Sequence, residues 1–393
     1  MPWDVLSDEQ RELRDLVRQL ARERIAPRAA EIDASHEFPW DVVELFREND
    51  IFGLFFDEEH GGLGTGTLLS LIAIEEVGKV CATSALILAV QELGSLGLKL
   101  AGTDEQKERY LPKLASGEWL PAYALTESGS GSDSAAMRTT ARREGDEYVL
   151  DGSKRFITNA GVAGLYTVFA KTDPDAGHGG ISAFVVEADT PGFAVARLEP
   201  KMGISGSTTG ELTFDGCRIP VENLLGEEGE GFRIAMRILD RSRPGVAAQA
   251  LGIAQGATDY ALEYAKTRET MGKPIGQHQL IQAKLADMET ECEAARGLLY
   301  RFGRMADEGV EGAELTKASA MAKLKCGDVA MAVTTDAVQI LGGYGYIREY
   351  PVERFMRDAK ITQIYEGTQE IQRLVIAREM LRESRAFLLA GVA

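Results

Sequence analysis

The chain has 393 residues, 45% of them hydrophobic and 26% charged, which is enough for two or three globular domains. Acidic residues outnumber basic ones by 61 to 43, and the net charge of −18 argues against nucleic acid or an anionic membrane surface as the main partner. The longest apolar stretch, around residues 85–90, is far shorter than the ~20 residues of a membrane span, so we expect none.

The cysteine and histidine patterns bear on compartment and metal binding. The four cysteines lie far apart without a C-x-x-C motif, which is typical of reduced thiols in a reducing compartment. The four histidines have no metal-ligand spacing, so we expect no protein-bound metal. The first residues carry no basic or apolar signal region. These features favour a cytoplasmic protein.

Residues 7–118 have helical periodicity. Ser7 and Gln10 have the spacing of a capping box, and an amphipathic pattern follows them. Further helical patterns cover residues 40–49, 67–80, 83–100 and 103–115. This segment predicts an N-terminal helical domain.

Residues 119–225 change to short runs that alternate or are rich in β-branched residues. These runs are residues 147–150, 166–171, 181–187 and 212–214. Asp151-Gly152 and Asp215-Gly216 supply turn residues between strands. The segment predicts a middle antiparallel β domain with long loops.

Residues 226–393 return to longer helical patterns. They lie near residues 245–267, 279–307, 314–341 and 369–388. Pro244 stands where a helix could begin, since the missing N–H of proline costs nothing at a first position. The predicted fold class is therefore α+β multidomain, with a C-terminal helical bundle.

Common nucleotide and hydrolase motifs are missing from the sequence. There is no G-x-G-x-x-G that opens a βα unit, no P-loop and no G-x-S-x-G elbow. Two loop segments could still meet a ligand. Residues 123–133 (YALTESGSGSD) could bring donors to a phosphate or a ring edge, or form a solvated connection. Residues 156–161 (FITNAG) could pack on a flat ring or simply end a strand.

Two later segments carry charged residues next to glycines. Arg268 ends a helical run and could be a helix C-terminal charge or a phosphate clamp. Residues 339–346 end another helix in Gly-Gly. Glu366 lies between Tyr365 and Gly367, ahead of a helical pattern. Aromatic neighbours can desolvate such a carboxylate and raise its pKa toward that of a general base, although helix-capping acids are commoner.

In joint order and spacing these segments resemble the acyl-CoA dehydrogenase family, and among its members the short-chain, medium-chain or branched-chain bacterial types. The resemblance covers about residues 7–385, and its most specific block reads RDAKITQIYEGTQEIQR. It implies an N-terminal helical domain at residues 1–118, a middle β domain at 119–225 and a C-terminal four-helix-bundle domain at 226–393.

The resemblance also implies FAD as cofactor and the oxidation of an acyl-CoA thioester to trans-2-enoyl-CoA. Glu366 aligns with the catalytic base, which takes the α-proton while the β-hydride passes to flavin N5. The implied cofactor-binding residues are Tyr123, Leu125, Thr126, Gly131, Ser132, Phe156, Ile157, Thr158, Arg268, Gln279, Gln339, Gly342, Gly343, Thr368 and Glu370. The implied substrate-binding residues are Ser132, Asp240, Arg243 and Gly367.

Partners follow from the same resemblance. Electrons would leave through electron-transferring flavoprotein, in fatty acid β-oxidation. Arg268 and Gln279 would complete the FAD site of a neighbour, so we expect a homotetramer built as a dimer of dimers. Residues 85–93 align with the pocket floor of relatives, and their size admits a short, medium or branched saturated chain. Two alternatives stay open: an acyl-CoA oxidase that uses O₂, and a non-catalytic flavin-binding assembly protein.

Four positions depart from patterns frequent in the family. Ser128 replaces a proline, Phe156 a tryptophan on the flavin face, and Met271 a phenylalanine near the neighbouring FAD. Ser242 stands where the isovaleryl and long-chain branches carry their catalytic carboxylate. The absence of a carboxylate there supports Glu366 as the base.

Overall fold

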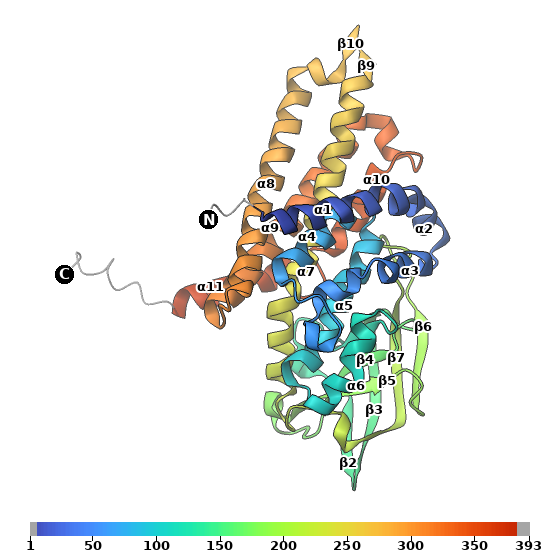
Figure 1. Ribbon diagram of the computed structural model, residues 1–393, viewed down its shortest axis with the longest axis vertical. Coiled ribbons are helices and arrows are strands. Elements are labelled where there is room, and N and C mark those ends of the chain that lie inside the picture. Colours follow the sequence, from blue (N-terminus) through green and yellow to red (C-terminus); the bar gives the residue numbers. More distant parts are fainter. Residues whose placement is uncertain (1–5, 383–393) are drawn as a thin grey trace, which may run out of the picture.

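The computed structural model describes residues 6–382, with helices at one end of the long axis and a β-sheet at the other (Figure 1). The N-terminal helices are α1 (Asp8–Leu20), α2 (Ala29–Ser35), α3 (Trp40–Glu48), α4 (Thr67–Gly78), α5 (Ala82–Ala101) and α6 (Asp104–Ala115). The predicted capping box is confirmed, because Ser7 Oγ accepts the Gln10 N–H at 3.1 Å and Gln10 Oε1 accepts the Ser7 N–H at 3.0 Å.

Helix α5 is more apolar than residues 85–90 alone indicate. By length and composition its 20 residues could cross a membrane, but 78% of the apolar window is buried inside the protein. Helix α4 and the later helix α7 (Gly231–Thr267) pack against it, which is the environment of a core helix. This burial explains the continuous apolar composition without a bilayer.

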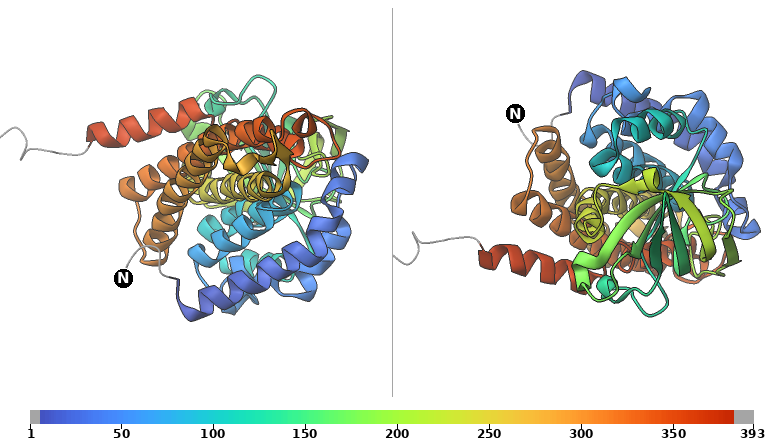
Figure 2. Two further views of the ribbon diagram at one scale, coloured as in Figure 1. Left: turned by 90° about the horizontal axis from the view of Figure 1, so that it is seen from above. Right: turned by 90° about the horizontal axis from the view of Figure 1, so that it is seen from below.

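The middle of the chain forms a twisted sheet that lies in front of the helices when the molecule is seen from below (Figure 2). The strands are β1 (Pro121–Ala124), β2 (Thr140–Glu144), β3 (Glu147–Thr158), β4 (Leu165–Lys171), β5 (Ile181–Glu187), β6 (Phe193–Leu198), β7 (Thr209–Pro220) and β8 (Leu224–Leu225). Their order is β6-β7-β3-β2-β4-β5-β8, with β1 beside β4. Most pairs are antiparallel as predicted, but β1 and β2 pair with β4 in parallel.

The prediction of turns at the two Asp-Gly pairs is wrong. Asp151-Gly152 lies inside β3 and Asp215-Gly216 inside β7, which are neighbouring antiparallel strands. The register shifts between Leu150 and Gly152, and the Gly216 N–H donates to Asp151 Oδ1 at 2.8 Å. The glycines therefore bend two long paired strands as a bulge instead of ending them.

The C-terminal region consists of long helices and a small hairpin. Its elements are α7 (Gly231–Thr267), β9 (Glu269–Thr270), β10 (Lys273–Pro274), α8 (Gln279–Asp307), α9 (Ala313–Leu341), α10 (Val352–Ile361) and α11 (Gln369–Arg382). Helix α11 extends away from the rest of the molecule (Figures 1 and 2). The part of the predicted last helix beyond residue 382 lies outside the described residues.

Pro244 corrects the predicted start of α7, because the helix begins at Gly231 and the proline lies in its interior. An interior proline removes one hydrogen bond to the carbonyl four residues earlier, here that of Asp240. The helix nevertheless continues for 37 residues, since it packs against α4, α5, α8 and α9 along its length. Tertiary packing therefore overrides the local preference of proline.

Candidate active site

Glu366 lies in the turn between α10 and α11, in a backbone conformation that ordinary residues rarely adopt. Its φ is +53° and that of the following Gly367 is +94°. A left-handed conformation costs a residue with a Cβ about 1–2 kcal/mol, so the surroundings must hold it. Arg243 Nε donates to the Glu366 carbonyl at 3.2 Å, and Gln372 Nε2 donates to the Gly367 carbonyl at 2.9 Å.

The Glu366 carboxyl group faces α7. Its Oε2 accepts the Ser242 hydroxyl at 2.6 Å. Burial raises the pKa of Glu366 above its ordinary value, and the Ser242 hydrogen bond and the charges of Arg243 and Lys323 oppose that rise. The result is a partly buried carboxyl group whose affinity for a proton is tuned by three neighbours, as a general base requires.

Asp240 and Arg243 lie one helical turn apart beside this carboxyl group. Arg243 is 4% exposed and its Nη1 donates to Asp240 Oδ1 at 2.9 Å. The other Asp240 oxygen accepts the Thr316 hydroxyl at 2.7 Å. Burial lowers the pKa of Arg243, whereas Asp240 and Glu366 raise it. Of the predicted substrate residues, Asp240, Arg243 and Gly367 are therefore brought together around Glu366.

The loop after β1 is held by a buried ion pair that sequence reasoning missed. Lys154 Nζ lies 2.8 Å from Glu127 Oε1 and donates to the Leu125 carbonyl at 3.1 Å. Glu127 also accepts the backbone N–H groups of Arg138 and Thr139, at 2.6 and 3.0 Å. One carboxylate thus closes the loop onto itself, and the lysine ties it to β3. A lysine at an inward-facing position of a strand is the one sequence signal that could have indicated this ion pair.

The two predicted flavin-facing segments lie side by side. The Arg155 N–H donates to the Thr126 carbonyl at 2.8 Å, which joins β3 to the loop after β1. Phe156 is 57% exposed with φ at +59°, whereas Ile157 is buried. Of the other predicted residues here, Leu125 is buried, Tyr123, Thr126 and Thr158 are half-buried, and Gly131 and Ser132 are exposed.

Arg268 belongs to a separate surface. It caps the C-terminal end of α7, and its guanidinium lies 5.2 Å from the ring centre of Tyr344. Together with Gly342 and Gly343 it lines a hollow of about 460 Å³. Gln279 and Gln339 are exposed and do not line this hollow.

Thr368 and Glu370 lie on either side of Gln369, the first residue of α11. The Thr368 hydroxyl accepts the Ile371 N–H at 3.4 Å, and Glu370 is exposed in the first turn. Both are close to Glu366 in the chain. The buried Gln369 between them donates to the Leu324 carbonyl at 2.8 Å and so fixes the start of α11 on α9.

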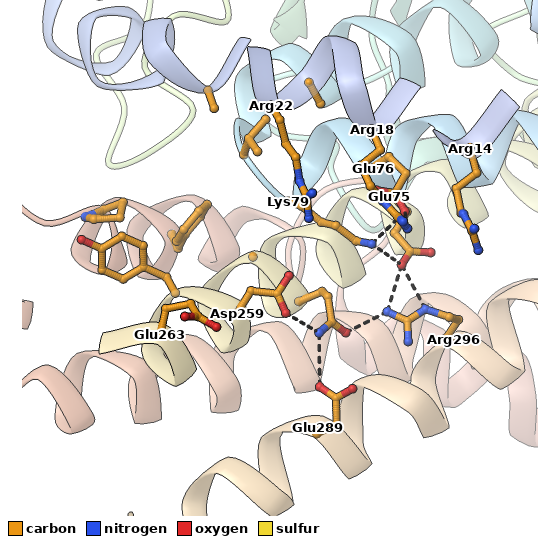
Figure 3. Close-up of a pocket in the computed structure, with 18 of the residues that line it drawn as sticks. Arg14, Arg18, Arg22, Glu75, Glu76, Lys79, Asp259, Glu263, Glu289 and Arg296 are labelled. Atoms are coloured by element: carbon orange, nitrogen blue, oxygen red, sulfur yellow. Dashed lines mark hydrogen bonds and ion pairs between the residues drawn. The ribbon is translucent and has the colours of Figure 1, made fainter. Parts of the chain in front are cut away.

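A larger cavity of about 770 Å³ lies elsewhere, among α1, α4, α7 and α8 (Figure 3). Several of the charged side chains in its walls pair with one another. Arg296 lies 3.0 Å from Glu75, and Arg18 and Lys79 lie 2.9 and 2.8 Å from Glu76. Because these groups satisfy one another, we interpret the cavity walls as a structural network between the N-terminal helices and the bundle.

One group of potential metal ligands occurs within residues 6–382. Asp57, Glu59 and His60 each place one ligand atom within 4.8 Å of the others. The two carboxylates are exposed, and exposed acidic groups commonly gather without an ion. The group therefore gives no support to a metal site.

Comparison with known proteins identifies the family. Models of the acyl-CoA dehydrogenase N-terminal, middle and C-terminal domains match residues 7–118, 122–217 and 229–381. The chain belongs to the acyl-CoA dehydrogenase family. Relatives that are 48% identical include proteins named acyl-CoA dehydrogenase, so the chain is an oxidoreductase.

Individual relatives match along nearly their whole length. Cyclohexane-1-carbonyl-CoA dehydrogenase of Geobacter metallireducens is 48% identical, over 96% of this chain and 99% of the relative. The butyryl-CoA dehydrogenase structure from Megasphaera elsdenii has a TM-score of 0.93 at 45% identity, over 96% and 99% of the two chains. A chain from the structure described as the electron transferring flavoprotein of Acidaminococcus fermentans has a TM-score of 0.94 at 46% identity, over 97% of this chain and 100% of the other.

Proteins of this family are FAD flavoproteins, and several residues here fit that cofactor. The Tyr123 hydroxyl is buried without a hydrogen-bond partner among residues 6–382, which suits contact with a ligand. A Cβ built at Gly131, Gly342 or Gly343 would meet open space, so these backbones are accessible. The exposed Phe156 ring offers a face for a flat ring system.

Proposed function

We propose that the protein oxidises an acyl-CoA thioester to trans-2-enoyl-CoA, with Glu366 as the base that removes the α-proton. The observation that carries this proposal is the left-handed turn that directs the Glu366 carboxyl group toward Ser242 on α7. In the family as the sequence resemblance describes it, positions 366 and 242 are the two alternative places for the base. Their side chains touch here, so both would reach the same substrate atom, and only Glu366 can accept a proton at neutral pH.

The protein also offers a donor for the developing negative charge. Loss of the α-proton gives an enolate, and its oxygen needs hydrogen-bond donors. No hydrogen bond found among residues 6–382 uses the Glu366 backbone N–H. This free N–H lies beside the proposed base, so it can donate to the thioester carbonyl. FAD, held by the residues named below, would supply the redox chemistry as the acceptor of the β-hydride.

The residues proposed to hold FAD fall into two groups. Tyr123, Leu125, Thr126, Gly131, Ser132, Phe156, Ile157 and Thr158 would hold the cofactor of their own subunit, with Thr368 and Glu370 at the start of α11. Arg268, Gln279, Gln339, Gly342 and Gly343 would reach the cofactor of a neighbour. Arg243 and Arg268 are 25 residues apart on α7, which is about 37 Å along a helix. A cofactor that presents its reactive ring to a substrate at the Glu366 turn, where Arg243 lies, would have to span this length to reach Arg268 of the same subunit.

This separation supports an assembly of more than one chain, and we propose the homotetramer, built as a dimer of dimers, that the family resemblance implies. Next to Arg268, Met271 at the tip of the β9–β10 hairpin is 94% exposed, and Leu280 on α8 is 82% exposed. Such apolar side chains commonly mark interfaces. Light scattering should give four chains for the wild type, and Met271→Asp should shift the assembly to smaller species with lower FAD content. A fully active, FAD-loaded monomer would contradict the proposal.

The central experiment is the Glu366→Gln variant, with Glu308→Gln at the exposed end of α8 as a control for the substitution. Butyryl-CoA is added anaerobically, and loss of the yellow flavin absorbance is followed by stopped flow. The variant should bind FAD and bleach at least ~10²-fold more slowly, because the base is gone. Near-normal bleaching would refute the assignment of Glu366.

We also propose an electron acceptor, a range of acyl groups and a cellular compartment for the protein. The likeness to a chain from a structure described as an electron transferring flavoprotein supports that class as the acceptor. Faster flavin reoxidation by O₂ alone than by this acceptor would favour the oxidase alternative, and failure of any acyl-CoA to bleach the flavin would favour the assembly protein. A panel of short-chain, medium-chain and branched-chain acyl-CoAs, read by flavin bleaching, tests which acyl group the protein prefers. The four buried free cysteines support a cytoplasmic location.

A further inference from the structure

Lys323, near the middle of α9, is a charged residue buried against the proposed catalytic turn. Its side chain is 1% exposed. Its Nζ donates to the Gly367 carbonyl at 2.7 Å and lies 3.2 Å from Gln369 Oε1. A lysine is rarely buried to this degree without a partner of opposite charge in direct contact. Here its direct partners are neutral oxygens, and of the nearby carboxylates Glu366 favours its charged form most, ahead of Asp328 and Glu370.

The turn receives cations from two different helices. Arg243 of α7 donates to the Glu366 carbonyl at 3.2 Å, and Lys323 of α9 donates to the next carbonyl, that of Gly367. Gln372 of α11 donates to both, at 3.3 and 2.9 Å. Three donors on two successive carbonyls fix the peptide planes of the left-handed turn. Those planes directly follow the Glu366 Cα, so they hold the backbone conformation that directs the Glu366 carboxyl group.

The charges around the turn define what Lys323 does to Glu366. The groups that face the Glu366 carboxyl group are Ser242 and Arg243 from α7, Lys323 from α9 and the Tyr123 hydroxyl from β1. Both cations lower the pKa of Glu366, against the effect of burial. Asp240 pairs with Arg243, which leaves Lys323 as the cation without a carboxylate in direct contact.

Lys323 is itself sensitive to pH. Burial lowers its pKa to about 7, while Glu366, Asp328 and Glu370 favour its charged form and Arg243 opposes it. The two groups therefore titrate as a pair, each stabilising the charged form of the other.

We propose that Lys323 is a positioning residue for α-proton abstraction: its ammonium group clamps the Gly367 carbonyl and stabilises the ionised Glu366 carboxylate. This inference rests on the proposed function, because it takes Glu366 as the base. A residue that only filled space at this position would leave the proton affinity of Glu366 unchanged when replaced. The pH dependence of proton abstraction therefore separates the two roles.

The test measures α-proton abstraction alone. Acetyl-CoA has α-protons but no β-carbon, so it cannot be oxidised, and exchange of its methyl protons in D₂O reports the base step by NMR. The FAD-loaded variants are Lys323→Met, Lys323→Gln and, as matched control, Lys325→Met, which removes a partly exposed lysine of α9 that pairs with Glu291. Bound FAD and the thermal midpoint are measured alongside exchange. The Lys323→Gln variant keeps a hydrogen-bond donor for the Gly367 carbonyl but lacks the positive charge. It replaces Lys323→Met in the test if that variant does not fold.

Both Lys323 variants should move the acidic limb of the exchange profile to higher pH, by at least about 0.5 unit, because a cation near the carboxylate is lost. Lys323→Met should also exchange at least ~10-fold more slowly at the plateau, and Lys323→Gln should recover part of that loss. Lys325→Met should match the wild type. An unchanged acidic limb in both Lys323 variants would overturn the inference. Exchange that persists in Glu366→Gln would instead refute the proposed base, whatever Lys323 does.

Discussion

Replacement of Lys154 by methionine tests whether the buried ion pair in the middle domain holds the proposed flavin loop. The Lys154 side chain is 0% exposed and that of Glu127 is 9% exposed. Methionine keeps much of the volume but removes the charge that faces Glu127 and the donor to the Leu125 carbonyl. The Glu127 carboxylate would then be buried with only the backbone N–H groups of Arg138 and Thr139.

The expected cost follows from this burial. Removal of one partner from a buried pair destabilises a protein by about 3–5 kcal/mol, because the remaining charge is uncompensated. Adding Glu127→Gln to the variant removes that charge and should restore at least about 1 kcal/mol. Lys171→Met, at a partly exposed lysine that ends β4, is the matched control and should stay within about 0.5 kcal/mol of the wild type.

Urea unfolding followed by circular dichroism gives the stability, and flavin absorbance after gel filtration gives the FAD content. The single variant should lose stability and FAD together, because the same carboxylate closes the loop of residues 127–139. The double variant should regain stability more than FAD. Wild-type stability and full FAD in Lys154→Met would refute the reasoning, since a buried charge would then carry no cost.

Two further predictions concern proton affinity. Ser242→Ala removes a hydrogen bond to the ionised Glu366, so the acidic limb of acetyl-CoA exchange should move to higher pH; an unmoved limb would contradict the geometry. Asp358 accepts the Ile204 N–H, and burial raises its pKa to about 7 from 3.8. Between these values the folded protein holds a proton that the unfolded chain lacks, so Asp358 lowers stability as pH rises. In Asp358→Asn the urea midpoint should therefore rise relative to the wild type from about pH 4 to pH 7; a constant difference would contradict this.

Most of the helical fold could be predicted because its signals are local. The helix predicted at residues 279–307 matches α8 (Gln279–Asp307), and that at 314–341 starts one residue from α9 (Ala313–Leu341). Helices of this length repeat their apolar stripe many times, so chance agreement is small. The Asp-Gly pairs misled for the opposite reason. Two residues with turn chemistry carry no information about the strand that lies opposite them. Here the pairing of β3 with β7 determines that both Asp-Gly pairs lie inside strands and not in turns.

The catalytic base could be assigned only through the resemblance. Taken alone, Glu366 looks like a residue that caps α11, but the hydroxyl of Thr368 has that task. What distinguishes Glu366 is its left-handed backbone and its contact with Ser242, which is 124 residues earlier in the chain. No local pattern encodes such a contact, because three helices from separate parts of the sequence create it.

Lys323 and Lys154 share a physical reason for being buried. Each donates to the carbonyl of an irregular segment, Gly367 in one case and Leu125 in the other, from a helix or strand interior. A ligand-binding turn inside a protein has carbonyls that no helix or strand satisfies, and leaving them unpaired costs about 1–3 kcal/mol each. A long flexible amine can reach them where a backbone cannot. In α9, Lys323 lies three residues after the buried Ala320 and three before the buried Cys326. Burying a lysine on such an apolar stripe is costly unless its ammonium group meets a buried acceptor. This pattern is therefore a sequence signal for residues that support a site without touching its ligand.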